Sequence, residues 1–165
     1  MIPWGVRAFV LVSLVSLGCG TGEDSEGPTG DADADTDADG DGTAAGLCVD
    51  TINGYRDTLA LAHLSRWTDA ESCSDLEARS DSETGVPHGA FGTCGESAQN
   101  ECPGWGGPPE AMIESCLAMM WAEGPGEPFS EHGHYLNMSN AGFTTVACGY
   151  YTTPEGAVWA VQNFR

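Results

Sequence analysis

The stretch Glu131-His132-Gly133-His134-Tyr135 places two imidazoles two residues apart, beside a carboxylate and a glycine. If this stretch is extended, both histidines project to the same side. A hairpin-like pattern follows it and runs out to Val161-Gln162-Asn163-Phe164. We expect one of these histidines to take part in the chemistry of the protein, together with residues that converge on it from elsewhere in the chain.

The segments before this stretch have the apolar spacing of helices. The pattern predicts helices over residues 49–62, 69–82 and 110–121, the second with Ala70, Cys73 and Leu76 turned inward. The intervening range 85–107 is rich in glycine and shows little periodicity, so we expect a loop-rich region there.

The segments after it have the pattern of strands. Two β-rich runs, from Phe143 to Tyr151 and from Ala157 to Phe164, flank a turn that contains proline and glycine. This pattern predicts an antiparallel hairpin. Helices first and strands afterwards indicate an α+β domain rather than a parallel sheet.

The composition is strongly acidic. The 165 residues include 25 acids against five arginines, with no lysine, and the net charge is −20. Such a surface repels phosphate, so nucleic acid is excluded as a partner class. The acidity favours solubility and does not separate an enzyme from a binding protein.

The N-terminal segment 1–19 has the features of an export signal. Arg7 precedes an apolar run over residues 8–17, which is too short to span a bilayer comfortably. The run ends in Gly18-Cys19, which resembles a bacterial lipobox with Cys19 as the lipidated residue, although Ser16 stands where leucine is usual. An ordinary secretory signal is the alternative. Both interpretations take the protein out of the cytoplasm, either to the bacterial cell envelope or into the medium.

Residues 20–46 are expected to form a disordered acidic linker, because the segment has no aromatic residue and its charges repel one another. It begins like an EF-hand loop at Asp35, but the twelfth position, where that loop needs a bidentate acid, is Gly46. The linker holds nine of the 25 acids. The remaining 16 face four arginines, so the predicted domain 47–165 has a net charge of −12.

Six cysteines remain once Cys19 is set aside as the lipid site. An even number in an exported chain predicts three disulfides, and six cysteines allow fifteen pairings. The closest pair in sequence, Cys94 and Cys102, is the one pairing that we expect. A zinc site made of cysteines is disfavoured because no C-x-x-C occurs. The disulfide candidates are Cys48, Cys73, Cys94, Cys102, Cys116 and Cys148.

The order of short motifs along residues 49–165 resembles the CAP superfamily. This family comprises the cysteine-rich secretory proteins, antigen 5 and the pathogenesis-related 1 proteins, and its domain is also called the SCP domain. The motifs that carry the resemblance are Asn53-Gly54-Tyr55-Arg56, Leu64-x-x-Trp67, His88, Gly95-Glu96, Met120-Trp121-x-Glu123, Gly133-His134-Tyr135, Ala147-Cys148-Gly149 and Val161-Gln162-Asn163-Phe164.

The resemblance implies a three-layer α-β-α sandwich with a small antiparallel sheet. It also implies a surface cleft lined by two histidines and two glutamates, which correspond here to His88, Glu96, Glu123 and His134. Two features depart from the family pattern. Glu123 follows Trp121 by two residues instead of three, and Leu136-Asn137 replaces the usual Thr-Gln.

Such a cluster has a chemistry of its own. Two neutral imidazoles, here His88 and His134, can hold Zn²⁺ or another divalent ion, with carboxylates orienting them. Without a metal, His–Glu pairs can act as acid and base. Each residue also has an ordinary structural alternative. These are a solvated loop histidine for His88, a helix or turn cap for Glu96, a surface acid for Glu123 and a core histidine for His134. His132 is either a further cleft residue or a solvated neighbour.

These features predict an exported, lipid-anchored CAP-domain binding module. The resemblance implies lipid, sterol or protein ligands and, in some relatives, a divalent metal. The alternative is a metal-dependent or acid–base hydrolase that acts on peptides through the same cleft. A third alternative is a passive surface protein. Other enzyme signatures are missing from the sequence, which contains neither H-E-x-x-H nor a nucleophile elbow.

Overall fold

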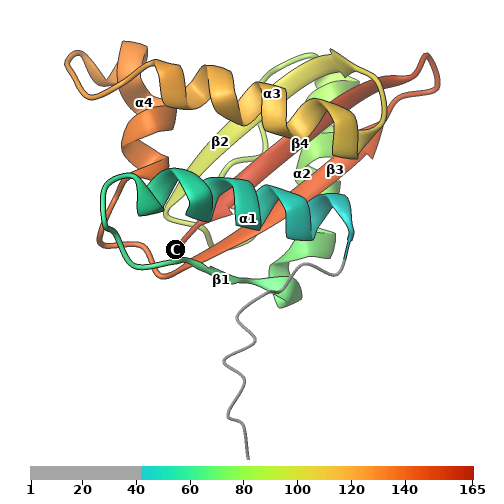
Figure 1. The fold of residues 1–165 in the computed structure, drawn as a ribbon. Helices are drawn as coiled ribbons and strands as arrows, with labels where there is room; N and C mark the ends of the chain where they lie inside the picture. The colour runs from blue at the N-terminus through green and yellow to red at the C-terminus, as the bar shows by residue number, and fades with distance from the viewer. Residues whose placement is uncertain (1–41) are drawn as a thin grey trace, which may run out of the picture. The chain divides into compact units, whose positions relative to one another are not determined.

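The computed structural model describes residues 42–165 (Figure 1). The predicted signal segment with Cys19 and the predicted linker up to residue 41 lie outside the described residues. The elements in chain order are α1 (Ala44–Asp57), β1 (Ser65–Arg66), α2 (Thr68–Thr84), β2 (Ala98–Gly106), α3 (Pro109–Ala122), α4 (Phe129–Met138), β3 (Thr145–Thr152) and β4 (Ala157–Phe164).

The elements form three layers. Figure 1 shows α1, α3 and α4 on one face of the sheet and α2 on the other. The strand order is β1-β3-β4-β2, with β3, β4 and β2 antiparallel and the two-residue β1 parallel to β3. The α+β class, the α-β-α layering and the β3–β4 hairpin are therefore confirmed. The sheet is mixed rather than purely antiparallel because of β1.

Helix α1 begins and ends earlier than the apolar spacing predicts. Its N-cap is Thr43, whose hydroxyl accepts a hydrogen bond from the Gly46 N–H at 3.1 Å. At the other end the Thr58 hydroxyl donates to the Tyr55 carbonyl at 2.6 Å, and the backbone of Ala60 is left-handed, with φ of 53°. The predicted range 49–62 is therefore wrong at both ends. Residues 44–46 belong to the fold rather than to the linker.

Helix α2 buries Ala70 as predicted, but the rest of its buried face differs from the predicted one. Leu76 is 64% exposed, whereas Ser74, Glu77 and Asp81 are buried. The helix lies close to the sheet, since a Cβ added at Gly149 of β3 would meet the Ser74 backbone carbon at 2.2 Å. Small and polar side chains at helical spacing allow this approach, so the expectation of an inward Leu76 is wrong.

Strand β2 lies inside the range 85–107, which the sequence analysis assigns to a loop. It pairs with β4 over residues 98–102 and again over 105–106, with a register shift between Cys102 and Trp105. The glycines and the proline of this segment hide its strand character, because such residues are usually depleted in strands. The loop assignment is wrong for this part.

All six predicted cysteines form disulfides, but the expected pairing of Cys94 with Cys102 is wrong. Cys102 lies on β2 and faces α3, whereas Cys94 lies in the loop beside α2 on the other face of the sheet. Their closeness in sequence is therefore not closeness in space. The three bridges are Cys48–Cys148, Cys73–Cys94 and Cys102–Cys116.

The apolar core lies between the sheet and the helices α1 and α3. Burying one large aliphatic or aromatic side chain contributes roughly 1.5–3 kcal/mol, so this layer supplies most of the hydrophobic stabilisation. Its fully buried members include Ile52, Leu64, Ile113, Leu117, Val146, Val158 and Phe164.

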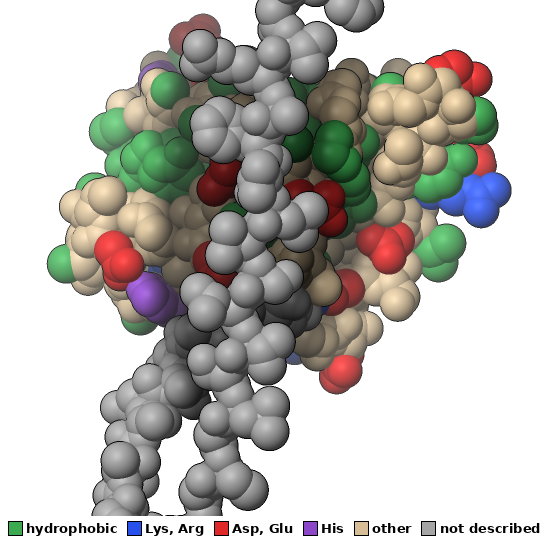
Figure 2. Space-filling view, turned by 45° about the vertical axis from the view of Figure 1, so that its right-hand side comes forward, with side chains coloured by type: hydrophobic (Ala, Val, Ile, Leu, Met, Phe, Trp, Pro, Cys, Tyr) green, Lys and Arg blue, Asp and Glu red, His purple; other side chains and the backbone are tan. Residues whose placement is uncertain are grey.

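The surface of the domain carries acidic side chains and few basic ones. Figure 2 shows acidic side chains spread over the visible face of the domain. Within residues 42–165, none of the helices combines the length and the apolar character needed to cross a bilayer.

Candidate functional site

The two histidines of the family pattern, His88 and His134, come from different parts of the chain and lie close together beside the edge strand β2. His88 belongs to the loop between α2 and β2, and His134 belongs to α4. Their ring centroids are 6.4 Å apart, with an angle of 28° between the planes. The side chain of His88 is 42% exposed and that of His134 is 34% exposed, so both rings are open to solvent on one side.

Helix α4 contains the stretch with two histidines, which is therefore not extended as the sequence analysis supposes. In a helix, residues two apart point in roughly opposite directions. His132 Nδ1 lies 2.8 Å from the Glu123 carbonyl oxygen and 2.9 Å from that of Gly124. His132 thus satisfies carbonyls that the end of α3 leaves free. It is neither a second cleft residue nor a solvated neighbour.

Glu123 lies against His134 despite its shifted position in the sequence. Its Oε1 is 2.5 Å from His134 Nδ1, and its Oε2 accepts the His134 backbone N–H at 3.0 Å. Because one carboxylate holds both the ring and the backbone of the same residue, the orientation of this imidazole is well determined. The short helix extension after Trp121 still brings the acid to the ring.

His88 is held by Gln99 and Glu101 rather than by Glu96, a glutamate of the family pattern. Its Nδ1 is 2.9 Å from Gln99 Oε1 and 3.8 Å from Glu101 Oε2. Its backbone N–H donates to the same Glu101 oxygen at 2.5 Å. The backbone of His88 is left-handed, with φ of 59°, a conformation that is uncommon for a side chain of this kind. Gln99 and Glu101 were missed because their strand was taken for a loop.

The Glu96 carboxylate is bound to the backbone of its own loop. It accepts the backbone N–H groups of Gly92 and Cys94, the latter at 3.0 Å, and it also lies beside Glu77. Across residues 42–165 it makes no hydrogen bond or ion pair with His88 or His134. The structure therefore brings three of the four family positions together and places Glu96 at the base of the loop.

A group of potential metal ligands surrounds Glu96 instead. Glu77, Cys94 and Glu96 offer ligand atoms within 4.8 Å of one another. Cys94 is bonded to Cys73, so its sulfur is not a thiolate and only two carboxylates remain as strong ligands. Burial raises the pKa of Glu77, and the adjacent Glu96 raises it further, against hydrogen bonds from Asn163 and Thr93.

The acids behind the His88 loop are deeply buried. Burial raises the pKa of Glu101 to about 7, with added repulsion from Asp81 and Glu77, although the hydrogen bond from His88 opposes the rise. Burial also raises the pKa of Asp81. One oxygen of each, Glu101 Oε1 and Asp81 Oδ2, has no hydrogen-bond partner within residues 42–165. Carboxyl groups in such surroundings favour the protonated form.

A groove runs past the two histidines. One hollow of about 190 Å³ is lined by His88 and His134 and shares Gln99 and Phe129 with a larger, more apolar hollow of about 440 Å³. The residues that line the larger hollow are His88, Phe91, Ser97, Ala98, Gln99, Phe129, Asn137 and Phe143. Two of its phenylalanines are at least half exposed, so the imidazoles stand at one end of an open apolar surface.

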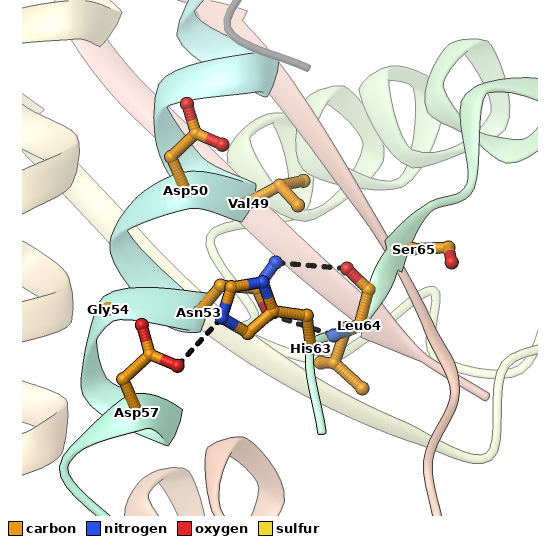
Figure 3. A pocket seen from close by; sticks show the side chains of 8 residues that line it. All are labelled: Val49, Asp50, Asn53, Gly54, Asp57, His63, Leu64 and Ser65. Atoms are coloured by element: carbon orange, nitrogen blue, oxygen red, sulfur yellow. Dashed lines mark hydrogen bonds and ion pairs between the residues drawn. The ribbon is translucent and has the colours of Figure 1, made fainter. Parts of the chain in front are cut away.

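A separate hollow of about 350 Å³ lies between α1 and the loop that leads to β1 (Figure 3). Asn53 exchanges two hydrogen bonds with the Leu64 backbone, and Asp57 Oδ1 lies 2.7 Å from His63 Nε2. Both members of this last pair are more than half exposed, so the pair contributes little to stability. Ser65 points away from His63 in Figure 3, and among the residues drawn the ring of His63 is paired with Asp57.

Comparisons with known proteins identify the family and the fold. A model of the CAP family, described as the cysteine-rich secretory protein family, matches residues 49–164. The crystal structure of Na-ASP-1 has a similar fold, with a TM-score of 0.56 and 11% sequence identity, over 73% of this chain. The chain spans only 38% of that structure. No curated protein matches the sequence.

Proposed function

The chain belongs to the cysteine-rich secretory protein (CAP) family, and we propose that it is an exported binding module that holds a divalent cation such as Zn²⁺ through His88 and His134. One observation carries this proposal. The Nδ1 atom of each imidazole faces an acceptor oxygen, from Gln99 in one case and from Glu123 in the other.

The positions of these acceptors decide which nitrogen is free to bind. When Nδ1–H of a neutral imidazole donates to an oxygen, the lone pair lies on Nε2. A carboxylate or amide behind a histidine is the usual support of a metal ligand and raises its basicity. Both rings therefore fit a metal that takes imidazole nitrogen, and zinc prefers such ligands. Bound there, the ion would act as an electrophile toward a ligand oxygen.

The groove indicates the class of ligand. The apolar surface around Phe91, Phe129 and Phe143 leads directly to the two histidines. A ligand with an apolar body and a polar or anionic head matches this arrangement, which favours a lipid or sterol over a peptide. The prediction is that a fluorescent fatty acid binds the protein and that Phe91→Ser weakens its binding. Leu76→Ser, which removes an exposed apolar side chain outside the groove, serves as the control, and equal binding by both variants would exclude the groove.

Export and anchoring complete the proposal. Three disulfides in a domain of this size are typical of proteins outside the cytoplasm. The predicted lipidation of Cys19 and the acidic linker would tether the domain to a bacterial membrane, most simply as a cell-envelope lipoprotein. A Cys19→Ala variant should then leave the membrane fraction, and its retention there would contradict the anchor.

A hydrolase that uses the same cleft is the rival function. The pair of His134 and Glu123 favours it, because an imidazole held by a carboxylate can act as a general base. Against it, neither His88 nor His134 makes a hydrogen bond with a serine, threonine or cysteine side chain within the described residues. A nucleophile of the protein itself is therefore not in place. Any hydrolysis would have to proceed through water activated at the cleft.

Titration of Zn²⁺ into the purified protein tests the proposed metal site. We expect binding of one ion by the wild type and loss of that binding in His88→Ala and in His134→Ala. His63→Ala, which removes an exposed histidine outside the groove, is the matched control and should bind as the wild type does. Equal behaviour of all four proteins would exclude the shared site. Turnover of a peptide library that disappears in the two cleft variants would favour the hydrolase instead.

A further inference from the structure

Gln99 and Glu101 stand on the same side of β2. Residues two apart in a strand project to one face, and here that face is covered by α2 and the His88 loop, as contacts with Glu77 and His88 show. Neither residue belongs to the four family positions. Together they provide every hydrogen bond that the ring and the backbone N–H of His88 make among the described residues.

The hydrogen-bond network determines the orientation of the Gln99 amide. Its Nε2 donates to Glu77 Oε2 at 3.1 Å and to Asn163 Oδ1 at 3.0 Å. The Asn163 amide is oriented in the same way, because its Nδ2 donates to Ser74 Oγ at 2.9 Å and to Glu77 Oε2 at 2.5 Å. A carboxylate accepts hydrogen bonds and does not donate them. Glu77 therefore directs both amide nitrogens toward itself and leaves Gln99 Oε1 facing His88.

An amide oxygen only accepts hydrogen bonds, so the nitrogen opposite it must be the donor. Gln99 Oε1 is 2.9 Å from His88 Nδ1, and a neutral His88 must then carry its proton on Nδ1. All members of this network except the ring are buried: Gln99 is 6% exposed, Glu77 2% and Asn163 0%. A buried and fully directed network of this kind is rigid.

We propose that Gln99, oriented by Glu77, is the positioning residue that fixes His88 as its Nδ1-protonated tautomer. Glu101 supports the same residue through its backbone N–H and holds the left-handed conformation at His88. Glu96, which occupies the glutamate position of the family pattern, has no part in orienting this ring. The proposal concerns the histidine itself, and only its effect on metal affinity rests on the proposed function.

The direct test is the ¹⁵N NMR spectrum of the histidine side chains in the metal-free protein, at a pH above the imidazole pKa of about 6.5. We expect His88 to show a pyrrole-type signal for Nδ1 and a pyridine-type signal for Nε2. Free imidazole side chains in water favour the opposite tautomer. A wild-type His88 with its proton on Nε2 would overturn the proposal without the need for any variant.

Three variants assign the effect to Gln99. Gln99→Met keeps the length but removes the acceptor, so His88 should lose its Nδ1–H preference. Gln99→Glu keeps an acceptor oxygen toward the ring and should restore that preference when its buried carboxyl is protonated, because it then donates to Glu77 as the amide does. Glu96→Gln is the matched control and should leave the His88 signals unchanged. A change of tautomer in Glu96→Gln but not in Gln99→Met would assign the role to Glu96 and refute ours. The His134 signals report in each variant whether the domain is folded.

Zinc affinity provides the second readout. Loss of a residue that orients a metal-bound histidine typically weakens metal binding by about 10- to 100-fold. We expect such a loss in Gln99→Met and near wild-type affinity in Gln99→Glu and in Glu96→Gln. If the wild type binds no zinc, the proposed metal function fails, and the tautomer of His88 still decides the role of Gln99. Wild-type affinity in Gln99→Met, with an unchanged tautomer, would refute the positioning role.

Discussion

On the face of the sheet covered by α1 and α3, aliphatic and aromatic side chains fill the space between the layers. On the face covered by α2, the buried side chains are largely polar, and they meet amides and acids from the sheet. The polar members of this second face are Ser74, Glu77, Asp81, Gln99, Glu101 and Asn163. The histidine cleft lies at the edge where the two faces meet.

The two faces of the sheet contribute differently to the stability of the domain and to the orientation of its side chains. Apolar burial is strong but has no direction, so it stabilises the domain without orienting a particular ring. Burying a polar network has a desolvation cost in free energy, and only matched hydrogen-bond donors and acceptors offset that cost. The polar face therefore contributes less to stability and more to specificity, and in this protein its directed bonds end at His88.

Two leucine-to-alanine substitutions, one in α3 and one in α2, give the strongest test of this difference between the two faces. Leu117 on α3 is fully buried in the apolar face, and Leu76 on α2 is 64% exposed. Leu117→Ala should lower the free energy of unfolding by about 4 kcal/mol, because it removes buried surface and leaves a cavity. Leu76→Ala should change it by less than about 0.5 kcal/mol.

Chemical denaturation of the two variants and the wild type, with disulfides intact, measures both values. The chemistry of the two changes is the same, so their difference reports only the surroundings of each leucine. A comparable loss in Leu76→Ala would mean that α2 buries its apolar side after all. The polar packing of that face would then be incorrect.

The apolar face is also the part of the fold that the sequence predicts best. The range expected for the third helix, 110–121, differs from α3 by one residue at each end. The hairpin of β3 and β4 was predicted from its two β-rich runs and the turn between them. In these elements most of the buried residues are apolar, so the apolar pattern of the sequence indicates where they lie.

The polar face was predicted poorly for the same reason. In α2 three of the five buried residues are serine, glutamate and aspartate and the other two are alanines, so apolar spacing pointed to Leu76, which is exposed. Strand β2 reads as a loop because glycine and proline follow its polar residues. The family pattern located His88 and His134, but local sequence carries no signal that Gln99 replaces Glu96 beside the first ring. That exchange depends on pairing between β2 and β4.

The polar face should make stability depend on pH through Glu101. Burial raises the pKa of this carboxyl from 4.5 to about 7, so between these values the folded protein binds a proton that the unfolded chain releases. Stability must therefore fall as the pH rises from about 4.5 to about 7. A shift of this size corresponds to about 3 kcal/mol. The groups that face Glu101 are Asp81, Glu77 and the His88 ring.

Glu101→Gln removes this dependence, because a neutral amide keeps an acceptor for the His88 N–H and has no ionised form to bury. The free energies of unfolding of variant and wild type, measured without metal, should be similar below about pH 4.5, separate between about pH 4.5 and 7, and stay apart by a constant amount above pH 7. The variant should then be more stable, by up to about 3 kcal/mol. Glu114→Gln on the exposed side of α3 is the control and should run parallel to the wild type at every pH. If the free energy of unfolding of Glu101→Gln is also parallel to that of the wild type at every pH, the Glu101 carboxyl ionises in the folded protein without a cost in stability. The buried polar face would then be open to water, and the contrast between the two faces would be smaller than their side chains suggest.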